Sequence, residues 1–175
     1  MRALILSLLV LAASPALAQT NTPSREALAL GGKVAHAAQP QLDQGVQTIV
    51  ESLQNGYRDS AVRNGQPVDE KALADAGKNE VTAARPLLWD GMARIYAQTF
   101  SMEELKALET YYRGHPGDPA SLPAPLAAKN GLLPDQEQAL IGEIGPRIIQ
   151  DLFGDYCSRA SCPNELRRTA GLPAK

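Results

Sequence analysis

Apolar residues recur along most of this chain at the three- and four-residue spacing of an amphipathic helix. The stripes are Leu42, Val46, Ile49, Leu53 and Tyr57; Val81, Ala84, Leu88, Met92, Ile95 and Thr99; and Leu140, Ile144, Ile148 and Leu152. No segment sustains the apolar/polar alternation of a half-buried strand. The pattern therefore predicts an all-α fold: a single compact domain of about six helices.

Turn residues divide the first part of the chain into helices. Ser24 is placed to cap a first helix that ends before Pro40, and we expect Gly31 and Gly32 to make that helix irregular. Asn64, Gly65 and Pro67 end the second helix.

Two prolines fall inside the later helical stretches. Pro86 interrupts the stretch 69–99, where we expect two helices, because proline lacks a backbone donor and clashes with the preceding turn. Gly145 and Pro146 predict a kink in the last long helix, which opens near Pro134.

The segment 95–117 has the clearest local signals. Ser101 and Glu104 have the spacing of a capping box, and Phe100 and Leu105 have that of a hydrophobic staple. Gly114 is predicted to close this helix in a left-handed cap, with Pro116 preventing its continuation. These signals predict a helix boundary and say nothing direct about chemistry.

The same segment resembles a bacterial family, the exported proteins carrying the domain of unknown function 2059. The matching positions are Tyr96, Phe100, Ser101, Glu104, Leu105, Tyr112, Pro116 and Gly117. His115 stands where the family often has serine. The resemblance implies a small, exported, all-helical protein of a Gram-negative bacterium, in a family without an established activity. It covers about two dozen residues, which are those of the predicted cap, staple, core stripe and turn.

The N-terminus predicts export. Arg2 precedes the apolar run 3–13, and the small residues Ala16 and Ala18 are typical of a signal peptidase site. A membrane anchor is the alternative, but the run is shorter than the roughly 20 residues that cross a bilayer. We expect a cleaved signal peptide at 1–18, a disordered leader at 19–23, one helical domain at 24–175, and a periplasmic location with no transmembrane segment after cleavage.

Removing 18 residues from 175 leaves 157, with 16 basic and 19 acidic side chains and a net charge of −3. The charges form no block of one sign, so nucleic acid is not an expected partner.

Cys157 and Cys162 are the two cysteines. A zinc site or a redox pair is an alternative, but the compartment and the close spacing favour a structural disulfide.

The sequence contains no nucleophile elbow, phosphate loop or zinc-protease motif. His36 is interpreted as a surface or half-buried helix position, and His115 as a turn residue that bonds the carbonyls of the preceding helix. Asp151 and Asp155 share a helix face and are interpreted as solvated surface. We expect no catalytic residue, no metal and no cofactor.

Aromatic residues concentrate between residues 89 and 112. All of them can belong to the core; alternatively Trp89, Tyr96 and Tyr111 line a groove for an apolar ligand or a partner peptide, with Tyr112 buried. We expect a non-enzymatic interaction or apolar-ligand-binding module whose partner is an envelope protein or an apolar molecule. The alternatives are a small envelope hydrolase with a site assembled from distant residues, and self-association through a helix face.

Overall fold

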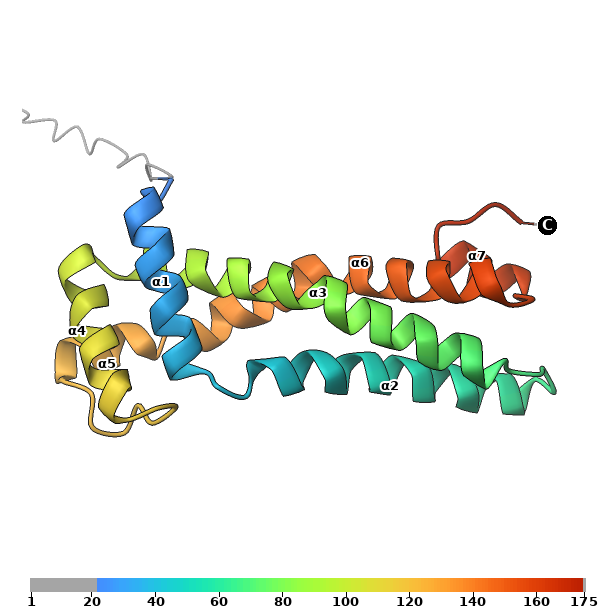
Figure 1. Cartoon of the computed structure of the whole chain (residues 1–175), viewed down its shortest axis with the longest axis horizontal. Coiled ribbons are helices and arrows are strands. Elements are labelled where there is room, and N and C mark those ends of the chain that lie inside the picture. Colours follow the sequence, from blue (N-terminus) through green and yellow to red (C-terminus); the bar gives the residue numbers. More distant parts are fainter. Residues whose placement is uncertain (1–21, 175) are drawn as a thin grey trace, which may run out of the picture.

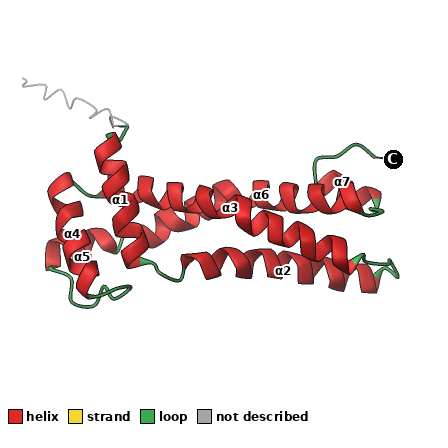
Figure 2. Ribbon diagram, in the orientation of Figure 1, coloured by secondary structure: helices red, strands yellow, loops and turns green. Residues whose placement is uncertain are grey.

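The computed structural model describes residues 22–174, which are helical without a strand (Figure 2). This confirms the all-α class. The helices of the described part are α1 (Arg25–Ala38), α2 (Leu42–Arg63), α3 (Glu70–Thr99), α4 (Met102–Gly114), α5 (Ala124–Asn130), α6 (Leu133–Arg159) and α7 (Asn164–Thr169). The predicted signal peptide, and the leader up to residue 21, lie outside the described residues. No described helix combines the length and apolarity that crossing a bilayer requires.

Helix α3 is the centre of the packing. It contacts α1, α2 and α6, while α2 and α6 touch each other at few positions. Figure 1 shows α2, α3 and α6 along the long axis, with α1, α4 and α5 gathered at one end and α7 at the other. Most stripe residues predicted from the sequence are buried in one continuous core. Because α2 and α6 share α3 as a support, a surface groove can form between them.

The close crossing of α1 over α3 depends on Gly31. A Cβ at this position would lie 2.5 Å from the carbonyl oxygen of Ala93. The expected irregularity at Gly31 and Gly32 is wrong, because α1 is continuous through both. Glycine serves here to bring two helix backbones together.

Pro86 does not divide α3. The expectation of two helices is wrong: a single helix runs from residue 70 to residue 99. Pro86 is exposed, whereas Ala84 and Leu88 on either side of it are buried. The packed face therefore continues past the proline, and tertiary packing outweighs the lost backbone hydrogen bond. Figure 1 shows α3 changing direction along its length.

Helix α6 likewise contains a proline, Pro146, without a break. Gly145 precedes it and has no Cβ to clash with the proline ring, which eases a helical conformation at that position. Figure 1 shows that α6 also bends, so two bent helices lie against each other along the middle of the molecule.

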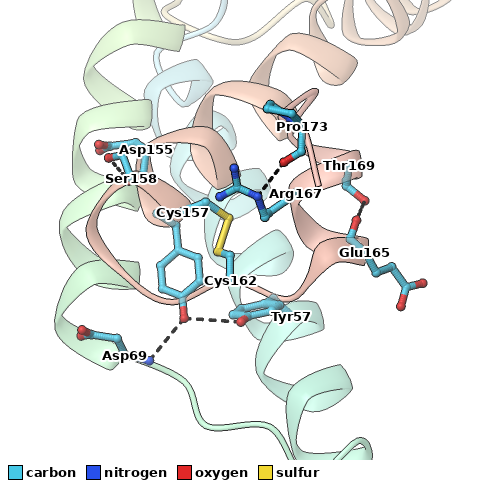
Figure 3. Close-up of a disulfide and its surroundings, with 11 residues drawn as sticks. Tyr57, Asp69, Asp155, Cys157, Ser158, Cys162, Glu165, Arg167, Thr169 and Pro173 are labelled. Carbon is cyan, nitrogen blue, oxygen red and sulfur yellow. Dashed lines mark hydrogen bonds between the residues drawn. A yellow bond between two sulfur atoms is a disulfide. The ribbon is translucent and has the colours of Figure 1, made fainter. Parts of the chain in front are cut away.

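A disulfide joins Cys157 to Cys162 at the end of α6, as predicted (Figure 3). Two hydrogen bonds near the disulfide connect the elements at this end of the molecule. The hydroxyl of Tyr57 donates to the hydroxyl of Tyr156 at 3.4 Å, and the backbone N–H of Asp69 donates to the same oxygen at 3.3 Å. Helices α2 and α6 and the start of α3 are therefore linked close to the disulfide.

Candidate functional site

An apolar groove lies where α2 and α6 face each other across α3. We call it the α2–α6 groove. Its apolar lining consists of Leu42, Val46, Ile49, Ala84, Leu88, Met92, Leu140, Ile141, Ile144 and Ile148. Helices α2, α3 and α6 each contribute to this lining. The groove therefore follows from the shared packing of α2 and α6 on α3.

The lining is almost entirely aliphatic. Glu137 is its one charged member, and its carboxylate accepts a hydrogen bond from the side-chain amide of Gln39. Leu42, Ile49 and Ile144 are half-buried, and Ile141 is 41% exposed. The groove thus presents apolar surface to solvent with almost no polar group to hydrogen-bond a ligand.

The volume of the groove is about 100 Å³. For scale, an apolar cavity of about 150 Å³ holds benzene. A helix, about 10 Å across with its side chains, needs far more volume than this. An extended peptide would leave backbone N–H and C=O groups without partners against the aliphatic walls. An alkyl group meets neither obstacle.

Two glycines are part of the groove lining. Gly45 of α2 and Gly145 of α6 both belong to the lining, and a Cβ built at either would meet no atom within 4 Å. A side chain introduced at Gly45 would therefore extend into open space at the groove. This offers a direct way to block it.

Trp89, the first of the predicted groove rings, makes its contacts at the corner between α1 and α2. Its ring stacks on His36 with centroids 3.7 Å apart, and its Nε1 donates to Asp43 Oδ1 at 3.0 Å. Arg85 Nε approaches the same carboxylate oxygen at 3.1 Å. Trp89 thus connects three helices through specific polar and stacking contacts.

Tyr96 and Tyr111 pack elsewhere. Tyr96 is 1% exposed and stacks on Phe100 in the core, where burial raises the pKa of its hydroxyl. Tyr111 is half-buried, stacks on His115 at 4.7 Å and accepts a hydrogen bond from the backbone N–H of Ser121 at 3.2 Å. The ring contacts of Trp89, Tyr96 and Tyr111 join each to different partners and bring no two of the three together.

The residues that carry the family resemblance form local structure. The Ser101 hydroxyl accepts from the N–H of Glu104 at 3.3 Å, and the Glu104 carboxylate accepts from the N–H of Ser101 at 2.7 Å. This is the predicted capping box. Phe100, Leu105 and Tyr112 are buried. Glu104 also forms an ion pair with Lys129 at 2.7 Å, which ties the start of α4 to α5.

The turn after α4 docks on α1. Gly117 has a φ of 71°, and its N–H donates to the carbonyl of Ala37 at 3.0 Å. The left-handed cap predicted at Gly114 is wrong: Gly114 stays in the helix, His115 is the C-cap with a φ of −137°, and the left-handed residue is Gly117. The chain takes its left-handed residue at Gly117 because that is where the turn contacts α1, and glycine adopts a positive φ without steric cost.

Both histidines make structural contacts. His36 is exposed and stacked on Trp89, and His115 Nδ1 lies 3.1 Å from the carbonyl oxygen of Tyr111, as predicted. Among residues 22–174, no group of three or more His, Cys, Asp or Glu side chains gathers as metal ligands do.

Sequence reasoning missed Glu80, a carboxylate of α3 that is only 5% exposed. Its neighbours on α6 are Asp151, Asp155 and Arg147. Burial, with a smaller contribution from the two aspartates and an opposing one from the arginine, raises the pKa of Glu80 to about 7. Asp151 is exposed, as expected, and pairs with Arg147 at 3.3 Å. Asp155 is instead half-buried: it pairs with Arg159 at 2.8 Å and accepts a hydrogen bond from Asn79 of α3 at 2.9 Å.

Neither a family model, nor a curated protein, nor a solved structure matches this chain.

The α2–α6 groove was also missed, although its lining residues were found. The three apolar stripes contain most of them. Periodicity assigns a residue to the inner face of its helix but does not say how far apart two such faces stand. The gap between α2 and α6 is set by tertiary packing on α3.

Proposed function

We propose that this protein is a non-enzymatic binding module that holds an alkyl group in the α2–α6 groove. The observation that supports the proposal is an open groove with aliphatic walls from three helices. Exposed apolar surface of this kind costs solvation free energy, which a bound alkyl group recovers.

The proposal includes export to an oxidising compartment. The disulfide between Cys157 and Cys162 supports it, because such bonds persist outside the cytoplasm. The apolar N-terminal run and the small residues that follow it support the same location.

Titration of the protein with 1-hexanol, followed by methyl NMR, tests the binding. The methyl signals of Ile49, Leu88 and Ile144 should shift together, because these residues come from the three walls of the groove. Gly45→Leu should abolish the shifts by occupying the space beside α2. Gly56→Leu is the matched control: Gly56 also lies in α2, outside the groove lining, and a Cβ there also meets no atom within 4 Å.

Both substitutions raise helix propensity by about 1 kcal/mol, so they differ chiefly in whether the groove is filled. Hexanol that leaves the three methyl groups unshifted would contradict the proposal. So would equal loss of binding in the Gly45 and Gly56 variants.

A further inference from the structure

A second and larger hollow lies between α3 and α6, where these helices approach α5. We call it the Arg94 cleft. Its volume is about 530 Å³, within the range of small-molecule sites. Leu140 borders both this cleft and the α2–α6 groove, and its side chain packs against Gly91 in the seam between α3 and α6. Apart from Leu140, the two hollows share no lining residue.

Charges of both signs line the Arg94 cleft. Arg94 of α3 and Glu143 of α6 are exposed, and neither belongs to an ion pair of the described residues. Lys129 also lines the cleft, but its ammonium group is bound to Glu104 at 2.7 Å. One cation and one anion thus remain available to a ligand.

A polar contact between the helices orients a further donor. Thr99 Oγ1 donates to Gln136 Oε1 at 3.0 Å, and both residues line the cleft. With its oxygen engaged, the side chain of Gln136 has its amide N–H groups to offer. Amide N–H groups and a guanidinium are the donors that a carboxylate accepts most readily.

Apolar surface completes the lining. Ile95 and Leu140 are buried beneath the cleft, and Leu132 is 55% exposed in its wall. Leu132 is one of the few large apolar side chains of the described residues with so much surface in water. A ligand that covers it would remove that surface from solvent.

We propose that the Arg94 cleft binds a small zwitterion with an apolar side chain, the chemistry of a free apolar amino acid. Arg94 and Gln136 hold its carboxylate, Glu143 holds its ammonium group, and Leu132 and Leu140 contact its side chain. This site goes beyond the alkyl-binding function and does not rest on it, because Leu140 is the one residue that lines both hollows.

Three related probes separate the contributions of the carboxylate and the ammonium group to binding affinity. They are L-leucine, L-leucinamide, which lacks the carboxylate, and N-acetyl-L-leucine, which lacks the ammonium group. NMR titration following the side-chain amide of Gln136 gives the affinities. The wild type should bind leucine at least about tenfold more tightly than either analogue, since each lost charge-assisted hydrogen bond is worth that much or more.

Two variants test which side chain binds which charged group of the ligand. Arg94→Gln should remove the preference for leucine over leucinamide, and Glu143→Gln should remove the preference over the acetylated form. Both side chains are exposed, so the substitutions should preserve the fold, which circular dichroism verifies. Arg63→Gln, at an exposed arginine of α2 outside the cleft, is the control and should change neither preference.

The outcome also distinguishes this site from the α2–α6 groove. Gly45→Leu, which blocks the groove, should leave leucine affinity unchanged. Loss of leucine binding in that variant would place the ligand in the groove and overturn the proposal. Absence of leucine binding to the wild type, or equal affinity for all three probes, would overturn it as well.

Discussion

Replacing Glu80 by glutamine should stabilise this protein at neutral and alkaline pH and have little effect in acid. Glu80 lies in the seam between α3 and α6 with 5% of its surface exposed. Burial is the main cause that raises its pKa from 4.5 to about 7, and Asp151 contributes further. The folded protein therefore disfavours the ionised form.

The sign of the effect follows from the two pKa values. Below about pH 4.5, Glu80 is protonated in both the folded and the unfolded chain, and its contribution to stability is fully present. Between pH 4.5 and about 7 the unfolded chain ionises first, so this contribution is lost as pH rises. Above pH 7 the folded chain contains a buried carboxylate, and glutamine removes that cost.

The interval from 4.5 to about 7 corresponds to about 3 kcal/mol, at about 1.4 kcal/mol per pKa unit. Arg147 opposes part of this effect, and solvent screens the charges of Asp151 and Arg147, whose side chains are exposed. We therefore expect Glu80→Gln to raise the free energy of unfolding by about 1–2 kcal/mol at pH 8. Near pH 4 the variant and the wild type should differ by a few tenths of a kcal/mol.

Urea denaturation of both proteins at several pH values between 4 and 8 measures this difference. Glu143→Gln is the control, because Glu143 is an exposed glutamate of α6 without an ion pair among the described residues. Its effect should be small at every pH. A Glu80→Gln effect that is constant from pH 4 to pH 8 would refute the reasoning, because it would show that ionisation of Glu80 is not what the substitution removes.

Three further predictions concern the local motifs. Ser101→Ala should lower the free energy of unfolding by about 1 kcal/mol through loss of the cap, as measured by chemical denaturation; unchanged stability would argue against a structural role. In the same denaturation assay, Tyr112→Ala should lower the free energy of unfolding by about 3 kcal/mol or more, because Tyr112 is 2% exposed. Tyr111→Ala should lower it clearly less, because Tyr111 is half-buried; equal losses would place both rings in the core. Alkylation without reductant should label neither Cys157 nor Cys162, and mass spectrometry of the exported protein should find its N-terminus near Gln19; two labelled cysteines or a retained Met1 would contradict this.

The sequence by itself determined the elements and their inner faces. Helical periodicity, the Ser101 capping box and the turn at Asn64 and Gly65 act over a few residues, so they can be recognised without knowing what packs against them. The disulfide was predictable for the same reason, since its two cysteines are five positions apart.

Only tertiary structure decided how those faces are used. Pro86 remains inside α3 because the buried face continues on both sides of it, which no local rule can foresee. Glu80 falls on the spacing of Leu73, Ala76 and Ala84, so periodicity is compatible with a place on the inner face. Glutamate is rarely buried in proteins, so residue type points the other way.

The candidate site shows the same division. Val46, Leu88 and Ile144 could be assigned to inner faces, whereas the open space among them arises because α2 and α6 both pack on α3 and touch each other at few positions. The aromatic rings that formed the alternative groove in the sequence analysis are engaged in separate contacts within the protein. A groove is a property of the distance between helices, and that distance is set by packing across the whole core rather than by any one segment.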